Sequence, residues 1–467
     1  MQINTTSFVS APLTIAVVGL GKIGLPLAVQ YARHGQRVIG CDINQEVVDN
    51  LNAGRSHIQE ESELATDVPR LIRAGFFSAT TSTQAAVCEA QVVVVIVPVA
   101  IDAEHVVNTA HIDAASRAIG DALQPGTLVI YETTLPVGTT SRHLRQLLEQ
   151  TSQLQAGKDF YLAYSPERVS SGSVFHDLRM YPKVVGGIDA ASTERAITFY
   201  RSVLDAEIIA MASTDEAEFV KLIETTYRDV NIALANEYAC YADMHQLNVH
   251  AAIAAANTQP YSHIHTPGVG VGGHCIPVYP YFLFSNPLDH AQPGLADTAH
   301  TMLTLPRQAR QINDGMAEYT IQRLEEVVGP LYQQSVLLLG VAYRGDVRET
   351  AFTSARLLQA ALRYRDAIVY ADDVFFNEDE LKELGYTALP AGYEDRITAV
   401  ILQCDHRAYH HFNFSPFSRC QVVLDGRHAL RRAEIEAAGM HYLSIGDGTT
   451  LAVKNDNAQR LAKKTVS

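Results

Sequence analysis

Residues 14–35 read TIAVVGLGKIGLPLAVQYARHG, and they predict a strand, a glycine-rich turn and a helix in direct succession. In such a unit Gly19 permits the tight turn, Gly21 lets the backbone approach a pyrophosphate, and Gly24 allows the helix to pack closely. Amide hydrogens at the start of the helix can then bind phosphate groups. The stretch is typical of a Rossmann domain that binds a dinucleotide.

A second strand supplies the acidic residue expected of such a domain. RVIGCD ends at Asp42, eighteen residues after Gly24, where a carboxylate can accept hydrogen bonds from the ribose hydroxyls of adenosine. Its charge favours NAD over NADP, which carries a 2′-phosphate. An isolated GxGxxG is also compatible with a plain glycine turn, but here strand, helix and acidic residue agree. The predicted cofactor residues of this region are Gly19, Gly21, Lys22, Ile23, Gly24 and Asp42.

The rest of the chain extends the α/β pattern. Strand-like runs QVVVVIVPV, TLVIYET and DFYLAYS follow in the first half, and SVLLLGVAYRG, AIVYADD, ITAVILQCDH and QVVLDGRH follow in the second. A helical pattern of over thirty residues from about Thr214 separates the two sets. We expect an N-terminal Rossmann domain (1–205), a central domain with a long-helix spine (206–305), a C-terminal Rossmann-like α/β domain (306–450) and a polar tail (451–467).

Composition and charge argue against several classes of protein. The 467 residues are 47% hydrophobic and 19% charged, which is typical of a globular chain with large cores. The net charge of -15 disfavours binding to nucleic acid or to an anionic membrane surface. The longest apolar run, 92–101, is far shorter than the roughly 20 residues that cross a bilayer. We therefore expect neither nucleic acid nor a membrane as a partner.

Cysteine usage and the first residues indicate a cytoplasmic protein. The six cysteines have neither CxxC nor metal-ligand spacing, and MQINTTSFVSAPL lacks the basic and apolar regions of a signal peptide. Reduced thiols in the cytoplasm fit this pattern. No metal site is predicted, because His263 and His265 lie two residues apart in a loop, a spacing more typical of polar loops than of ligand pairs.

Cys275 is the candidate nucleophile. It follows the glycines of GVGVGGHCIPVYP, which allow a substrate to approach the backbone, and a thiolate is the best nucleophile among side chains at neutral pH. The alternative is a buried structural thiol, which is the usual fate of a free cysteine. The glycine setting favours the functional interpretation.

Several motifs occur in an order that resembles a known enzyme family. GLGKIGLPLA, YETTLPVGTT, YSPERVSSG, KLIETTYRDVNIALANE, GVGVGGHCIP, LGVAYRGDV and VVLDGRH are similar to those of the UDP-glucose/UDP-N-acetylhexosamine 6-dehydrogenase family, nearest its UDP-N-acetylmannosamine-type branch. The similarity extends from about residue 13 to about residue 430. It implies a cytoplasmic homodimer whose C-terminal domain binds the UDP-sugar and whose central helix carries site residues and a dimer interface.

The resemblance implies a four-electron oxidation with two NAD molecules. The primary alcohol on the sixth carbon of the sugar becomes a uronate, and Cys275 attacks the intermediate aldehyde and later forms a thioester that water cleaves. Lys221 would stabilise the developing oxyanion. Thr134, which also lies near the cofactor in the family, and Glu167 would position water and assist proton transfer.

The resemblance also assigns a set of substrate-binding residues, in which the two basic side chains near the C-terminus would offset diphosphate charge. These are Glu167, Arg168, Lys221, Arg228, Asn231, Gly272, Tyr279, Arg344 and Arg427. Each catalytic assignment has an alternative. Lys221 is also compatible with a solvated helix position, Thr134 with a turn cap, and Glu167 with an ion pair to Arg168.

The chain departs from the family pattern at positions that bear on chemistry. Tyr279 replaces an aspartate near the nucleophile, and a phenol with a reference pKa near 10 is no substitute for an ionised carboxylate at neutral pH. Thr225 replaces an asparagine one turn after the lysine, Tyr261 replaces a substrate-facing arginine, and Ala351 stands where an arginine is expected, with Arg348 three residues earlier. Because the nucleophile is retained, we interpret these changes as altered substrate or tuned chemistry.

Three functional hypotheses follow. The first is an NAD-dependent nucleotide-sugar 6-dehydrogenase acting on a UDP-N-acetylhexosamine or UDP-glucose, with SPER rather than NPEF favouring the hexosamine. The second is an oxidoreductase on the same scaffold that performs one oxidation or acts at another position of the sugar. The third is a non-catalytic protein that binds NAD or a sugar nucleotide. The motifs leave the particular sugar, the pathway and feedback regulation open.

Overall fold

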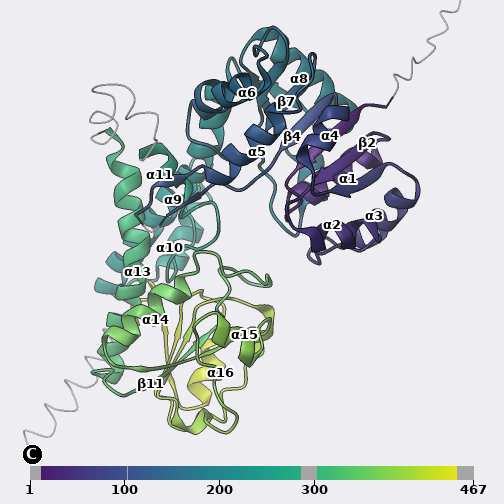
Figure 1. The fold of residues 1–467 in the computed structure, drawn as a ribbon. Coiled ribbons are helices and arrows are strands. Elements are labelled where there is room, and N and C mark those ends of the chain that lie inside the picture. Colours follow the sequence, from purple (N-terminus) through teal and green to yellow (C-terminus); the bar gives the residue numbers. More distant parts are fainter. Residues whose placement is uncertain (1–11, 103, 285–301, 450–467) are drawn as a thin grey trace, which may run out of the picture. The chain divides into compact units, whose positions relative to one another are not determined.

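A computed structural model describes residues 12–102, 104–284 and 302–449 (Figure 1). The chain divides into two compact units. Of the described residues, 12–102, 104–224 and 281–284 belong to the first unit, and 225–280 and 302–449 belong to the second. The predicted tail, 451–467, lies outside the described residues, and the predicted division into three domains stays a prediction.

The first unit is built on an eight-stranded sheet in the order β10-β9-β8-β7-β4-β1-β2-β3. Its strands are β1 (Thr14–Val18), β2 (Arg37–Cys41), β3 (Phe77–Thr80), β4 (Val92–Val95), β7 (Leu128–Tyr131), β8 (Tyr161–Tyr164), β9 (Lys183–Gly187) and β10 (Ile208–Ala210). Six consecutive strands of this order are parallel to their neighbours. The strand order reverses between β1 and β4, which is where open α/β sheets bind ligands at the carboxyl ends of their strands.

One strand direction differs from the rest of the first sheet. β9 pairs with β8 in the antiparallel sense, and β10 is parallel to β9. Alternating or continuous apolar runs identify strands but do not encode their direction, so the sequence pattern alone does not reveal this reversal. A short antiparallel pair, β5 (Ala100–Ile101) and β6 (Val107–Asn108), lies outside the main sheet.

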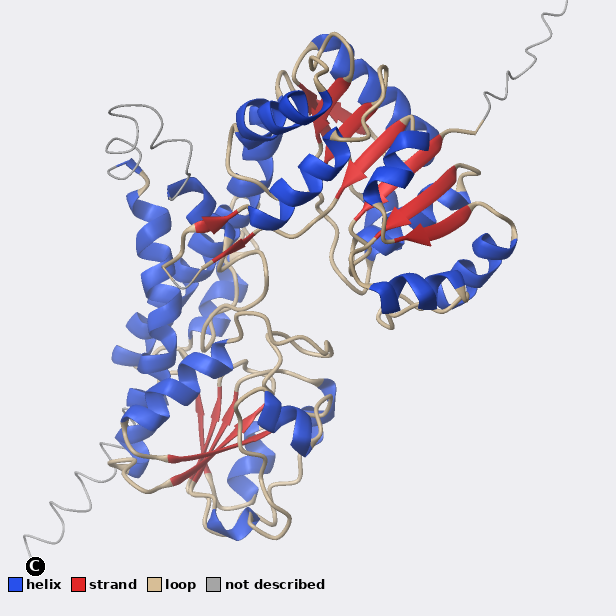
Figure 2. Ribbon diagram, viewed as in Figure 1, coloured by secondary structure: helices blue, strands red, loops and turns tan. Residues whose placement is uncertain are grey.

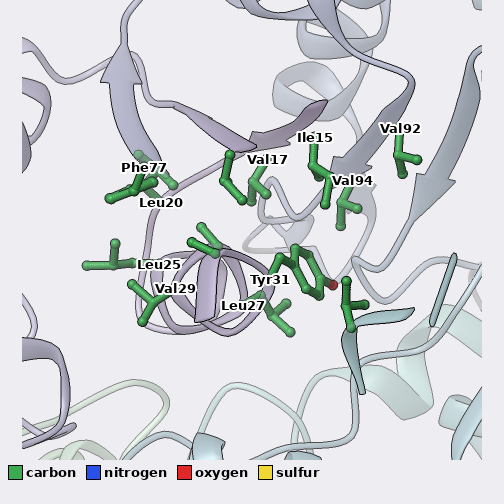
Figure 3. Packing of buried hydrophobic residues seen from close by; sticks show 14 of the residues in the cluster. Ile15, Val17, Leu20, Leu25, Leu27, Val29, Tyr31, Phe77, Val92 and Val94 are labelled. Carbon is green, nitrogen blue, oxygen red and sulfur yellow. The ribbon is translucent and has the colours of Figure 1, made fainter. Parts of the chain in front are cut away.

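Helices pack along the first sheet, as Figure 2 shows. They are α1 (Gly24–Arg33), α2 (Gln45–Asn52), α3 (Leu64–Arg73), α4 (Thr83–Glu89), α5 (Ala110–Gly120), α6 (Arg145–Ser152), α7 (Val174–Met180), α8 (Ala190–Val203) and the π-helical turn η1 (Thr139–Leu144). β1, β4, β7 and β9 are buried at every position, which is the burial expected of strands covered on both faces. Figure 3 shows Leu27 and Tyr31 of α1 beneath Ile15, Val17 and Val94 of the sheet.

The second unit contains a five-stranded parallel sheet in the order β12-β11-β13-β14-β15. Its strands are β11 (Ser335–Leu339), β12 (Ile368–Asp372), β13 (Ala399–Leu402), β14 (Val422–Asp425) and β15 (His441–Ser444). The four predicted strands are all present, and β15 is an additional short strand. The order reverses between β11 and β13, so this sheet has a second ligand-binding position of the same topological kind.

The described helices of the second unit are α10 (Val249–Ala256), α13 (Thr304–Val328), α14 (Ser354–Tyr364), α15 (Glu378–Glu383) and α16 (Arg432–Ala437), with the 3-10 turns η3 (Glu394–Arg396) and η4 (Arg407–His411). α14 presents Leu358 and Leu362 to the core, where they pack with residues of β11 and α13. The side chain of Thr353 caps α14 by accepting from the Ala355 amide. The predicted C-terminal α/β fold is therefore confirmed.

The long helix is also confirmed. α9 runs without interruption over Thr214–Met244, 31 residues, with Asp215 and Glu216 in its first turn. Its residues belong to the first unit up to Glu224 and to the second from Thr225. A shorter helix, α11 (Tyr279–Phe284), also contributes residues to both units. Within the described part of the chain, no helix has the length and hydropathy needed to span a bilayer.

Candidate active site

The glycine turn between β1 and α1 has the geometry that its sequence predicts. Gly19 has a φ of 99°, and a Cβ there would lie 2.8 Å from the Ile96 carbonyl oxygen. A Cβ on Gly24 would lie 1.9 Å from the carbonyl oxygen of Gly19, so only glycine permits this contact between turn and helix. A Cβ on Gly21 would meet no atom within 4 Å. The turn thus leaves space at Gly21, where a pyrophosphate can approach the backbone, and fits a dinucleotide.

The acidic residue lies beside this turn. Asp42 follows β2, and its Oδ2 accepts a hydrogen bond from the Leu20 amide at 3.0 Å. Oδ1 accepts from the amide of Asn44, the N-cap residue of α2, at 3.0 Å. Carboxylate oxygens can accept more than one hydrogen bond, so Asp42 can hold the turn and still receive ribose hydroxyls.

Two further predicted cofactor residues occupy the turn itself. Ile23 is the N-cap residue of α1, so it precedes amides that have no acceptor within the helix. Lys22 forms an ion pair with Glu60, with Nζ 2.9 Å from Oε1. Its charge is therefore already partly compensated by the protein.

Thr134 and Glu167 follow neighbouring strands, β7 and β8, at the same edge of the sheet. Thr134 is buried, and the Glu167 amide donates to the Glu132 carbonyl at 3.3 Å, which joins the two loops. Oε1 of Glu167 accepts from the amides of Arg168 and Val169 at 2.6 and 2.9 Å. The alternative of a side-chain ion pair between Glu167 and Arg168 is wrong, because the Arg168 guanidinium binds Glu224 of α9 instead.

A buried group of charged and phenolic side chains supports Glu167; we call it the Lys183 cluster (Tyr31, Glu132, Glu167, Lys183 and Tyr200). Nζ of Lys183 lies 2.8 Å from Oε2 of both Glu132 and Glu167. Oε1 of Glu132 accepts from the hydroxyls of Tyr200 and Tyr31 at 2.6 and 3.2 Å. Tyr31, Glu132, Lys183 and Tyr200 are buried, and the Glu167 side chain is only 9% exposed. The cluster joins α1, α8, β9 and the loops after β7 and β8.

α9 positions Lys221 against the same loops. Glu218 lies one turn before Lys221, and its carboxyl accepts from the amides of Gly138 and Thr140 at 2.5 and 2.8 Å. Glu224 lies one turn after Lys221 and binds Arg168. Residues three apart share a helix face. Lys221, which is buried, is therefore on the face that contacts the loops carrying Thr134 and Glu167. The alternative of a solvated helix lysine is wrong.

In the second unit, a polar network fixes the glycine loop that precedes Cys275. Oδ1 of Asn236, on α9, accepts from the Gly268 amide at 2.9 Å, and its Nδ2 donates to Asn313 of α13 at 2.9 Å. Asn313 in turn donates to Asp229 at 2.8 Å, and all three side chains are buried. Buried amides of this kind specify one backbone path, because leaving them unpaired is unfavourable.

Close packing continues up to the cysteine. The Gly273 amide donates to the Ala351 carbonyl at 2.9 Å, and a Cβ on Gly272 would lie 3.0 Å from the Phe352 carbonyl oxygen. Cys275 is half-buried, and its carbonyl accepts from the Tyr279 amide at 2.9 Å at the start of α11. Ala351, one of the departures from the family pattern, therefore contacts the cysteine loop through its backbone carbonyl.

Arg427 lines a surface pocket of about 330 Å³ in the second unit. Its Nε donates to the Gln403 carbonyl at 2.6 Å, and burial lowers the pKa of its guanidinium. His250 and His428 stack in this pocket with ring centroids 3.8 Å apart. The full lining is His250, Ile253, Ala254, Asn257, Ile264, Thr266, Pro267, Arg427 and His428. The pocket offers apolar faces and a guanidinium together, as a nucleotide requires.

Other predicted substrate residues have different surroundings. Asn231 holds the loop before the glycines, donating to the His263 carbonyl at 2.6 Å and accepting from the His265 amide at 3.0 Å. Arg228 and Arg344 are exposed. Arg348, considered as a replacement for the missing arginine at Ala351, instead binds Glu380 and the Phe375 carbonyl.

Comparison with known proteins identifies the family. Residues 13–204 match the NAD binding domain of the UDP-glucose/GDP-mannose dehydrogenase family, and residues 215–314 match its central domain. A UDP-N-acetyl-D-mannosamine dehydrogenase of Pyrococcus horikoshii is 33% identical over 445 residues, which cover 93% of this chain and all of the relative.

The chain belongs to the UDP-glucose/GDP-mannose dehydrogenase family.

Solved structures of this family have the same fold. A UDP-D-ManNAc dehydrogenase from Pyrococcus horikoshii aligns with a TM-score of 0.83 at 32% identity, over 93% of this chain and 100% of that one. A UDP-glucose dehydrogenase from Pyrobaculum islandicum aligns with a TM-score of 0.82 at 25% identity, over 94% and 99%. Membership confirms the predicted resemblance, the NAD cofactor and the class of NAD-dependent oxidoreductase. The roles of individual residues stay predictions.

Several residues of this family member could not be found from the motifs alone. Lys183 and Glu132 are 51 positions apart in the sequence, and Glu218 and Asn236 bind backbone amides of loops distant in the chain. The sequence signal for these residues is a charged or polar side chain within or beside an otherwise apolar strand or helix segment. Among the described residues, no group of three His, Cys, Asp or Glu side chains is arranged to hold a metal ion.

Proposed function

We propose that the protein oxidises the 6-hydroxymethyl group of a UDP-linked sugar to a uronate, with a UDP-N-acetylhexosamine as the preferred class. The glycine turn would hold two NAD molecules in succession, each of which would supply an acceptor for one hydride. Membership of a dehydrogenase family and the names of the relatives support the substrate class. The SPER motif of this chain, which favours a hexosamine substrate over UDP-glucose, agrees with it.

Cys275 is assigned the covalent step. Its thiol adds to the aldehyde from the first oxidation, with Sγ forming a bond to carbon and the proton passing to the former carbonyl oxygen. Loss of a hydride and that proton gives a thioester, and water then releases the carboxylate and restores the thiol. Lys221 stabilises negative charge on the sugar oxygen, while Thr134 and Glu167 position the water.

The observation that carries this assignment is the contrast between Cys275 and the structural thiols. Cys41, Cys404 and Cys420 are buried, and burial raises the pKa of each thiol to about 12. Cys275 is half-buried at the end of a loop whose glycines pack directly on backbone. A reactive thiol needs access to substrate, and Cys275 meets that condition.

The nucleotide is assigned to the pocket that Arg427 lines. Arg427 would offset diphosphate charge, and the apolar faces of Ile264 and Pro267 would contact the planar base. Arg344, which is exposed, is assigned to the phosphates as a second basic group. The departures at Tyr279 and Thr225 leave this pocket unchanged, because neither lines it.

The test is NADH production from a panel of UDP-sugars, with NADH counted per sugar consumed. We expect two NADH per sugar. Cys275→Ser should fail to complete the second oxidation, while Cys88→Ser, at an exposed cysteine of the first unit, should keep the stoichiometry. One NADH per sugar would favour a single oxidation, and binding of UDP-sugar without turnover would favour a non-catalytic protein.

We also propose that the protein is a homodimer through α9. Tyr227, Leu234, Tyr238, Tyr241 and Met244 are all exposed, between 40% and 67%, although each is large and mainly apolar. Spacings of three, four and seven residues place the first four on one helix face. Light scattering should give twice the chain mass, and Leu234→Glu should give a monomer. A monomeric wild type would contradict this. The cytoplasmic location stays a prediction, consistent with six free cysteines.

A further inference from the structure

The Lys183 cluster contains one ammonium group and two carboxyl groups in the interior of the first unit. Lys183 is 5% exposed and Glu132 is fully buried. An isolated charge in such a place is strongly unfavourable, so the ammonium group is needed to keep either carboxylate ionised. Nζ of Lys183 lies 2.8 Å from Oε2 of Glu132 and 2.8 Å from Oε2 of Glu167. Its position therefore determines how the negative charge is divided between the two carboxyl groups.

The surroundings shift the pKa values of the two carboxyl groups in opposite directions. Burial raises the pKa of Glu132 despite the opposing effect of Lys183. Burial also acts to raise the pKa of Glu167, but Lys183 and the backbone donors outweigh it and hold that pKa below its ordinary value of 4.5. Titratable pairs whose pKa values are pushed apart often have distinct roles.

We propose that Lys183 is a positioning residue, which fixes the carboxylate of Glu167 in orientation and keeps it ionised as a hydrogen-bond acceptor for the reaction. This rests on the proposed function, because it assigns Glu167 to the oxidation of the sugar. Oε1 of Glu167 is held by two backbone amides and Oε2 by Lys183. A carboxylate held by these donors can accept a hydrogen bond from water and thereby orient the water molecule. The same donors lower the affinity of the carboxylate for a proton, so it is a weak base.

The cluster also links this carboxylate to the cofactor-binding helix. Tyr31 is on α1, which begins at Gly24 of the glycine turn, and its hydroxyl binds Glu132. Tyr200 of α8 binds the same oxygen and lies under the Lys183 ammonium, 5.2 Å from Nζ to the ring centroid. The Lys183 ammonium is thus in contact with Glu132, Glu167 and Tyr200, which come from three separate segments, and such contacts restrict the placement of a functional group.

The other charged groups near Glu167 have their own partners. Arg168 binds Glu224, and Asp177, which lines the same small pocket as Glu167, accepts from the Ser170 amide at 2.9 Å. Neither replaces Lys183 as a contact of the Glu167 carboxylate. Removing the ammonium group should therefore leave mainly the backbone amides of Arg168 and Val169 to oppose the effect of burial on the Glu167 pKa.

The experiment measures the ionisation of Glu167 directly and the pH profile of kcat separately. Glutamate labelled with 13C at Cδ reports protonation by NMR in the full chain, with Glu167→Gln identifying the signal. In Lys183→Met we expect the Glu167 pKa to rise by about one unit or more. We also expect kcat to fall roughly tenfold to 100-fold, most strongly at low pH, with KM for NAD little changed. Lys183→Arg should restore both.

Glu132→Gln is the matched control. It removes the competing carboxylate while leaving Lys183 on Glu167, so the Glu167 pKa should stay low. Loss of function through damaged packing alone would instead raise no pKa in Lys183→Met and would not be reversed by Lys183→Arg. If Lys183→Met does not fold, the double variant with Glu132→Leu removes Lys183 together with its fully buried partner, leaves Glu167 in place and carries the same test.

The outcomes separate this inference from the proposed function. An unchanged Glu167 pKa and an unchanged kcat profile in folded Lys183→Met would overturn the inference. A wild type that oxidises no UDP-sugar would overturn the proposed function, while the NMR titration would still show whether Lys183 controls Glu167.

Discussion

Glu218 gives a sharp test of the packing between α9 and the loop after β7. Its side chain is fully buried, and both oxygens face backbone amides, of Gly138 and Thr140, with no lysine or arginine bound to it in the described contacts. Burial raises the pKa of Glu218 from 4.5 to about 8, although those hydrogen bonds act in the opposite direction. We expect Glu218 to be mainly protonated in the folded protein at pH 7.

This shift makes folding stability depend on pH. Because the pKa is higher in the folded state, the contribution of Glu218 is fully present below about pH 4.5 and is lost as pH rises toward 8. The difference corresponds to at most about 5 kcal/mol in the free energy of unfolding, and relaxation of the site reduces it to about 2–5 kcal/mol. Glu218→Gln has no such titration.

The assay compares melting temperatures of wild type and Glu218→Gln across this pH range. Between about pH 5 and about pH 8 the variant should gain roughly 5–15 °C relative to wild type, since 1 kcal/mol corresponds to about 2–4 °C for a unit of this size. Glu194→Gln, at an exposed position of α8, should give a constant difference. A constant difference for Glu218→Gln as well would refute the reasoning, because Glu218 would then be ionised when folded.

Three further predictions follow from the cofactor turn, the glycine loop and the pocket. Gly24→Ala should lower the free energy of unfolding by about 1–3 kcal/mol in calorimetry, because its Cβ would lie 1.9 Å from the Gly19 carbonyl oxygen. Gly21→Ala should instead keep the melting temperature and weaken NAD binding, and equal effects of the two would contradict the assigned roles. Asn236→Ala should destabilise the second unit by about 1–3 kcal/mol and lower kcat, measured by denaturation and steady-state kinetics; normal activity would show that its loop contact is dispensable. Arg427→Lys should weaken UDP binding in calorimetric titration, with NAD binding as the control, and unchanged UDP affinity would place the nucleotide elsewhere.

The cofactor turn could be predicted from the sequence because its determinants are local. Gly19, Gly21 and Gly24 lie within six positions, and their roles depend on the backbone of one turn. The long helix was equally accessible, since over thirty residues without proline or glycine leave few alternatives. β3, β9, β10 and β15 are not among the predicted strands because each is a short segment. The antiparallel pairing of β9 has no sequence signal, because apolar periodicity carries no strand direction.

The support of the candidate site depends on contacts between distant residues, which one sequence does not reveal. The alternative of an ion pair between Glu167 and Arg168 rests only on their adjacency in the sequence, whereas α9 supplies a better placed carboxylate for that arginine in Glu224. Lys183 lies in no recognisable motif, and its contacts with Glu132 and Glu167 join segments that are distant in the sequence. The sequence therefore predicts residues whose role depends on one turn or one helix, but it does not predict contacts between residues that are distant in the chain.

The double role of Asp42 has a practical consequence for changing the cofactor preference. Replacing this aspartate by a small residue is an obvious route to accept the extra phosphate of NADP. In this protein the same carboxylate also binds the amides of Leu20 and Asn44, so that replacement would loosen the turn and the start of α2 together. An engineered variant should keep one acceptor, as Asp42→Asn does, and introduce the phosphate-binding arginine on a neighbouring position.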